Sequence, residues 1–161
     1  MSPFHLRRAD RALTEASVVD SVLRRGRYAA IAMVHEGEPY VVTLSYGHDA
    51  DRGALYFHVA PEGRKIAAMR EHPGVCATVV IDGGYEEGAC KHHYESVVIT
   101  GTMALVEDPD EARHGMRILL GHLEADPGPV WERNRLDGDA VYERMRVARL
   151  DIDQITGKAG S

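Results

Sequence analysis

Apolar positions recur at helical spacing near the start of the chain. In residues 14–25 they repeat every three or four positions, which is the period of one helix face: Val18, Val19, Val22 and Leu23. Thr14 is a candidate cap for the first turn, because its hydroxyl can accept a hydrogen bond from a free amide. Gly26 suits the end of the helix. We therefore predict an amphipathic helix over 14–25.

A second helix is predicted from residue 108 to about residue 123. Asp108 precedes Pro109, and this order of a capping side chain and then proline is typical of a helix start. Glu111 stands three residues after the cap, as in a capping box. Apolar side chains from Ala112 to Leu123 then share one face.

Between these helices the apolar period changes to two, which indicates β-strands. In the segment 54–59, Leu55, Phe57 and Val59 alternate with Tyr56 and His58. Gly101 lies inside the fifth strand and predicts a bulge or a close backbone approach. Six strands are predicted, of which the first three form an antiparallel meander: residues 28–34, 40–46, 54–59, 75–81, 96–106 and 144–152.

The remaining segments read as connections. A short helix is predicted over 61–72, a loop over 82–90, an irregular stretch over 125–138 and a tail over 156–161. Six strands with helices before, between and after them predict a mainly β, antiparallel barrel with helices. No repeat or long linker divides the 161 residues, so a single domain is expected, with its core at about 12–158.

Composition narrows the function classes. A formal net charge of −6 disfavours a nucleic-acid partner, because duplex-binding domains usually carry a basic face. No apolar run is long enough to span a membrane, and residues 1–8 lack the apolar stretch of a secretory signal. The two cysteines, Cys76 and Cys90, are widely spaced and expected to stay reduced, so we expect a cytoplasmic protein.

Motifs for nucleotide binding and nucleophilic catalysis are absent: the chain has no G-x-G-x-x-G, no P-loop and no G-x-S-x-G. The segment after the third strand is more informative. Gly63 is followed by Arg64 and Lys65 in the first turn of a helix, where free amides and a positive partial charge suit a phosphate. The residues alone leave open whether these two cations bind an anion or are solvated surface charges.

Other side chains allow several interpretations. His58 either lines a ligand cleft or is a partly buried, hydrogen-bonded histidine. Cys90, His92 and His93 lack the spacing of a zinc site, because adjacent residues of a strand point to opposite faces, and no metal is predicted. Trp131 covers the core, a ligand or a subunit interface.

Four motifs in one order carry a family resemblance. They are Pro39-Tyr40-Val41-Val42-Thr43-Leu44-Ser45-Tyr46, Tyr56-Phe57-His58-x-Ala60-x-x-Gly63-x-Lys65, Tyr94-x-Ser96-Val97-x-x-x-Gly101 and Ile155-Thr156-Gly157-Lys158. From about residue 12 to residue 158 the chain resembles the pyridoxamine 5'-phosphate oxidase-like flavin-binding split barrels. Within them it is most similar to the nitroimidazole-resistance group.

The resemblance implies a six-stranded split barrel that forms a homodimer, with FMN in a groove at the subunit interface. His58 would lie near the flavin ring as an orienting or proton-donating group, or would only shape the pocket. Arg64 and Lys65 would hold the phosphate. The full set of cofactor-binding residues that the resemblance implies is Val42, Thr43, Leu44, Phe57, His58, Arg64, Lys65 and Ser96.

The sequence departs from the family pattern at three positions. Thr43 replaces a usual proline, Glu95 stands where a basic residue often precedes the serine, and Tyr142 takes the place of a tryptophan. The pyridoxal-phosphate signature of the true oxidases is not evident, so that substrate is not expected.

The implied function is an FMN-dependent oxidoreductase that takes electrons from NAD(P)H and reduces a small acceptor such as a nitroimidazole. The alternatives are a flavin-binding or sensor protein without turnover, a related barrel that uses haem or a deazaflavin, and a purely structural dimer.

Overall fold

The computed structural model describes residues 8–160. Residues 1–7 and Ser161 lie outside the described residues. The prediction that residues 1–8 contain no secretory signal therefore falls almost wholly outside them. The strands, with β1 and β4 very short, are β1 (Ala12–Leu13), β2 (Tyr28–His35), β3 (Glu38–Ser45), β4 (Gly47–Asp49), β5 (Ala54–Val59), β6 (Gly74–Glu86), β7 (Lys91–Leu105) and β8 (Arg146–Gly160). The helices are η1 (Ala9–Arg11), α1 (Ala16–Arg25), α2 (Arg64–Glu71), α3 (Pro109–Leu123), α4 (Gly128–Asn134) and α5 (Val141–Arg144).

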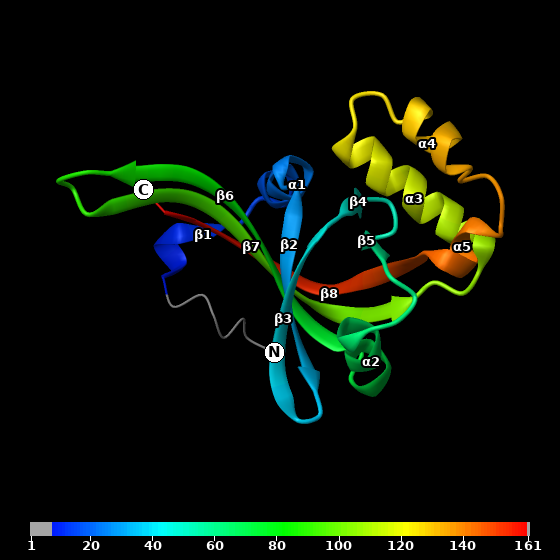
Figure 1. Ribbon diagram of the computed structural model, residues 1–161. Helices are drawn as coiled ribbons and strands as arrows, with labels where there is room; N and C mark the ends of the chain where they lie inside the picture. Colours follow the sequence, from blue (N-terminus) through cyan, green and yellow to red (C-terminus); the bar gives the residue numbers. More distant parts are fainter. Residues whose placement is uncertain (1–7, 161) are drawn as a thin grey trace.

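All strands belong to one antiparallel sheet in the order β3-β2-β6-β7-β8-β5-β4, with β1 added beside β8. Figure 1 shows this sheet curling on itself, with α1 at one end, α2 at the other and the α3–α5 group on the outside of β4 and β5. The six predicted strands are all present, and the mainly β, antiparallel class is confirmed.

The predicted meander of the first three strands is wrong at its third member. β2 and β3 pair as expected, but β5 pairs with β8 from Ala54↔Asp151 to Val59↔Arg146. Within the described residues β3 and β5 do not pair, so the barrel is open between them. The short turn between β3 and β5 misled the prediction, because β4 folds back on β5 there and takes the place of β3.

Three segments predicted as connections are regular. Residues 82–86 extend β6, and β7 begins at Lys91, so the expected loop over 82–90 shrinks to a four-residue turn at the end of a long hairpin. Residues 156–160 extend β8 along β7 and β1, where a tail was expected. The stretch 125–138 contains α4, whose apolar side chains pack under α3.

One of the two predicted helix caps forms. The Asp108 carboxylate accepts hydrogen bonds from the amides of Asp110 and Glu111, and Pro109 opens α3, as predicted. α1 begins at Ala16 without a side-chain cap, so the expected Thr14 cap does not form. The bulge predicted at Gly101 is confirmed, because the β7–β8 register shifts between Thr100 and Gly101.

The core has two parts because β5 is buried on both faces. Leu55, Phe57 and Val59 point into the barrel core with α1 and α2. Tyr56 points the other way, into a second cluster beneath α3. His58 lies on the Tyr56 face but remains exposed, and it is the one exposed position of this strand.

A polar network fixes α3 to the sheet beside the second cluster. Glu111 accepts hydrogen bonds from Arg149 and from the Tyr56 hydroxyl, the latter at 3.3 Å. The buried Asp49 carboxylate lies 2.6 Å from Nε2 of His114. Burial by itself would raise the pKa of Asp49, but hydrogen bonds from His114 and from the Arg52 amide outweigh it and hold that pKa below its usual value.

Two glycines of α3 give a matched test of this packing. A Cβ at Gly115 would lie 2.5 Å from Cδ1 of Tyr56, whereas a Cβ at Gly121 would meet nothing within 4 Å. Gly115→Ala should therefore lower the free energy of unfolding by about 1–3 kcal/mol through overpacking. Gly121→Ala should raise it by about 0.5–1 kcal/mol, because alanine favours the helix. Urea unfolding measures both, and a stable Gly115→Ala would contradict the packing.

Candidate functional site

The opening between β3 and β5 holds an apolar cavity of about 460 Å³. Thr43, Leu44 and Ser45 of β3 form one wall, and His58 of β5 lies on another. The outer wall comes from α3, α4 and α5 and consists mostly of aliphatic side chains: Met116, Leu119, Leu120, Leu123, Val130, Asn134, Leu136, Val141 and Met145. A flat, apolar molecule matches walls of this kind.

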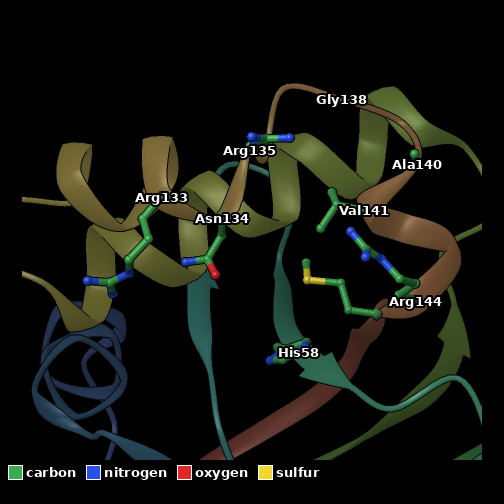
Figure 2. A pocket seen from close by; sticks show the side chains of 9 residues that line it. His58, Arg133, Asn134, Arg135, Gly138, Ala140, Val141 and Arg144 are labelled. Carbon is green, nitrogen blue, oxygen red and sulfur yellow. The ribbon is translucent and has the colours of Figure 1, made fainter.

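A second cavity of about 710 Å³ continues from the first. The two share His58, Asn134, Val141 and Met145. Figure 2 shows His58 on β5 at the base of this second cavity, with Arg144 reaching from α5 towards Val141 and the end of α4 opposite. The remaining lining is Arg133, Arg135, Gly138, Ala140 and Arg144.

His58 joins the two cavities. Its imidazole is exposed to them, yet the surrounding side chains partly desolvate it and lower its pKa from the usual 6.5. A histidine with a lowered pKa is neutral at pH 7, so one ring nitrogen donates a hydrogen bond and the other accepts one. Of the residues predicted to touch the flavin ring, His58, Thr43 and Leu44 are brought together here.

Val42 and Phe57, the other two residues predicted near the ring, line neither cavity. Phe57 is fully buried in the barrel core, with its ring centroid 6.5 Å from that of Tyr46. Val42 packs against the same core. Only the backbone groups of Val42 and Phe57 remain for contact with a ligand at this site, because both side chains pack into the barrel core.

Arg64 and Lys65 begin α2, as predicted. Gly63 precedes them with a φ of 120°, a backbone conformation that residues other than glycine rarely adopt. The helix has no side-chain cap. The guanidinium of Arg64 lies 4.6 Å from the centre of the Tyr40 ring. Among residues 8–160, Lys65 has neither an ion pair nor a hydrogen bond to its side chain. Free amides and two cations are therefore gathered at one exposed helix start.

Ser96 lies apart from this phosphate-type site within one chain. Its hydroxyl donates a hydrogen bond to the Lys158 carbonyl at 3.5 Å. Ser96 pairs with Val80 of β6, two residues from Thr78, which pairs with Ala30 of β2. Tyr40, which Arg64 covers, pairs with Met33 of β2, three residues from Ala30 in the opposite direction. Five residues of strand span about 16 Å at 3.3 Å each. Ser96 and Arg64 therefore do not meet in one subunit.

The other candidates have local partners. His92 lies 2.9 Å from Asp82, and His93 lies 3.3 Å from Glu86, both across the β6–β7 hairpin. Within residues 8–160 no group of three histidine, cysteine or acidic side chains is placed to hold a metal ion. Trp131 is half-buried under α3 and carries Arg117 on its ring at 4.9 Å, outside both cavities.

Sequence reasoning predicted α3 and its apolar face but assigned it to no site, and it missed the part of the outer wall from α4 to α5. Arg133, Asn134 and Arg135 lie in the stretch 125–138, which was expected to be irregular. Arg144 was expected to begin the sixth strand, but it ends α5, which was not predicted. The available signal was Pro129 in the first turn followed by the apolar pair Val130 and Trp131, because proline is favoured at a helix start. The left-handed residue that ends the helix, Arg135, is seen only in the structure.

No helix of the described part of the chain is long and apolar enough to cross a membrane.

The fold and cavities define a split barrel with a cleft along its opening, and comparison with known proteins agrees. The chain belongs to the pyridoxamine 5'-phosphate oxidase family, which it matches over residues 15–159. An uncharacterized protein of Rhizobium meliloti (strain 1021) is 34% identical over 144 residues, which cover 86% of this chain and 87% of the relative.

Two solved structures show the same fold. A proposed 5-nitroimidazole antibiotic resistance protein of Bacteroides thetaiotaomicron is 24% identical, with a TM-score of 0.77 over 92% of this chain and 86% of that one. An FAD-binding protein of Mesorhizobium loti is 27% identical, with a TM-score of 0.65 over 94% of this chain and 98% of that one. The resemblance inferred from the four motifs is confirmed at the level of family and fold.

The pKa of His58 gives a pH-dependent test of the site. Because the folded protein binds this proton less tightly than the unfolded chain, His58 contributes stability that is present above about pH 6.5 and is lost as the pH falls. NMR titration of the ligand-free protein should give an imidazole pKa below 6.5 for His58.

His58→Gln should flatten the loss of stability between pH 7.5 and pH 5. His48 also has a pKa lowered by burial and acts in the same direction, so the difference between wild type and variant is the quantity to measure. A His58 pKa at or above 6.5 would show that the cavity does not desolvate the ring.

Proposed function

We propose that the protein is an FMN-binding oxidoreductase that reduces small acceptors, with nitroaromatic compounds as the class to test first. The observation that carries the proposal is the pairing of an apolar cleft with an uncapped, doubly cationic helix start, on a chain of a family named for a flavin-dependent oxidase. Flavin-binding relatives of the same fold support it, among them the FAD-binding protein of Mesorhizobium loti.

The residues present fit the proposed cofactor. The isoalloxazine would lie against Thr43 and Leu44 of β3, in a cavity whose walls are apolar on the α3 side. The phosphate would bind the first amides of α2 with Arg64 and Lys65, where Gly63 leaves the approach open. Ser96 would belong to the second subunit's edge of the groove, since in its own chain it is offset by about five strand residues from Tyr40, which Arg64 covers.

A bound flavin would supply the hydride and electron transfer between a reduced nicotinamide and the acceptor. The chain's own part is to position the acceptor and to donate a hydrogen bond to it. His58 stands where the two cavities meet, and its neutral imidazole can donate a hydrogen bond to the acceptor or orient it on the ring. The aliphatic wall from α3 keeps water from that side of the cleft.

The homodimer is proposed from an exposed apolar sheet face. Tyr28, Val34, Val41 and Val80 are between 40% and 62% exposed, and all four lie on the outer face of β2, β3 and β6. Small side chains join them, since Ala32 pairs with both Val41 and Cys76. A contiguous apolar sheet face of this kind is typical of a subunit interface. Cys76 and Cys90 are both free and exposed, which suits a reducing compartment, and we propose the cytoplasm.

Lys65→Ala tests the phosphate site. Loss of one charge-assisted contact to the phosphate should weaken FMN binding about tenfold or more, measured by quenching of flavin fluorescence. Arg70→Ala is the matched control, since Arg70 is an exposed cation at the other end of α2 and should change affinity less than about twofold.

FMN titration, nicotinamide oxidation and the visible spectrum together separate the alternative functions. FMN binding without nicotinamide oxidation in the presence of any acceptor would indicate a flavin carrier or sensor. A Soret band in the purified protein, or binding of a deazaflavin in preference to FMN, would replace FMN as the cofactor. Equal FMN affinity in wild type and Lys65→Ala would remove Lys65 from the site.

Val41→Glu tests the dimer. A charge in the centre of the exposed face should convert the dimer into a monomer, measured by size-exclusion chromatography with light scattering. FMN affinity should fall with it, because the proposed groove needs both subunits. Ser17→Glu, on the exposed side of α1, should leave both unchanged. A Val41→Glu dimer with full FMN affinity would show that this face is not the interface.

A further inference from the structure

The larger of the two cavities is strongly cationic although the chain as a whole is acidic. Arg133, Arg135 and Arg144 line it, together with His58 and Asn134, and no aspartate or glutamate is among its lining residues. The formal net charge of the chain is −6. The pKa of His58 is lowered, so the positive charge of this cavity comes from the three guanidinium groups.

Four acidic residues stand next to the cavity lining in sequence. Glu132 and Glu143 adjoin Arg133 and Arg144 but do not line the cavity. Asp137 and Asp139 flank Gly138, which itself lines the cavity, yet they pair with Arg117 and Arg113 of α3. In residues 8–160 neither an ion pair nor a side-chain hydrogen bond involves the three cavity arginines. Within the described residues, Asp137 and Asp139 thus form ion pairs with arginines of α3, and no ion pair involves the arginines that line the cavity.

Arg135 also breaks a local backbone rule. It ends α4 with φ 53° and ψ 45°, the left-handed conformation in which glycine or asparagine is preferred. Its side chain lines the cavity. Glu36 and Cys90 have a similar positive φ, so this backbone conformation alone does not mark a functional site. What matters for the cavity is the position of the Arg135 side chain, which adds a third positive charge to the lining.

We propose that this cavity binds the anionic group, a phosphate or a carboxylate, of the substrate whose ring lies in the adjoining apolar cavity. The inference rests on the proposed function for its assignment to a substrate, because the apolar cavity is the one proposed for the flavin ring and its reaction partner. His58, Asn134, Val141 and Met145 belong to both cavities, so one molecule can extend through both. Guanidinium groups bind such oxyanions in bidentate fashion.

Two ligand pairs test the inference and separate the two sources of the anion. 4-Nitrobenzoate and 4-nitrobenzyl alcohol differ by a carboxylate on the acceptor, and NADPH and NADH differ by one phosphate on the donor. Isothermal titration of the full-length protein, with and without added FMN, should give at least about tenfold tighter binding for the charged member of one pair. That preference should decline as ionic strength rises.

The double variant Arg135→Gln/Arg144→Gln should lose this preference and keep the affinity for the uncharged member. Its FMN affinity should stay within about twofold of wild type, because the flavin phosphate is assigned to Arg64 and Lys65. Arg70→Gln, an exposed cation of α2, should behave as wild type. Circular dichroism and the midpoint of thermal unfolding establish that the double variant is folded.

Three results would overturn the inference: no charge preference in wild type for either pair, a preference that survives in the double variant, or a parallel loss of FMN affinity in that variant. The last would assign the cavity to the flavin phosphate. Failure of the proposed function looks different. If neither wild type nor any variant binds FMN, but wild type still binds 4-nitrobenzoate more tightly than 4-nitrobenzyl alcohol, the anion site is supported and the flavin assignment is wrong.

Discussion

The pairing of β5 with β8 is the constraint on which the rest of the molecule depends. β5 pairs with β8 along one edge and with β4 over Ala54–Tyr56 along the other, and within the described residues β3 does not pair with it. The opening that results is where the apolar cavity lies. Because β8 follows α3, α4 and α5 in the chain, its return to β5 also carries these helices over the opening, and they become the outer wall of the site.

Burial of β5 on both faces has a chemical consequence. Three side chains enter the barrel core, namely Leu55, Phe57 and Val59, and Tyr56 enters the cluster under α3. His58 is therefore the only exposed side chain of this strand. The imidazole is therefore held on a rigid strand between two cavities. A polar group so placed is positioned by the fold itself and needs no loop to bring it into place.

The arginines near the site fall into two groups, those in ion pairs and those that line the cavity. Glu111, Asp139 and Asp137 form ion pairs with arginines that hold α3 to the sheet and to the α4–α5 loop, while over residues 8–160 no ion pair involves the arginines that line the cavity. Paired guanidinium groups stabilise the fold, and unpaired ones in a concave site are available to a ligand. The site and its supporting network thus use the same residue type for two purposes.

Local patterns determined much of this protein. Period-two alternation located the six long strands, Asp108 and Pro109 fixed the start of α3, and Gly63 with Arg64 and Lys65 marked the cationic helix start, because each of these features depends on neighbours in sequence. Four ordered motifs identified the family for the same reason. The partner of β5, the inward orientation of Phe57, the separation of Ser96 from Arg64 and the arginine cavity were decided only by the tertiary structure. Strand order and the meeting of side chains from β3, β5, α4 and α5 depend on long-range contacts, and residue spacing along the chain does not encode them.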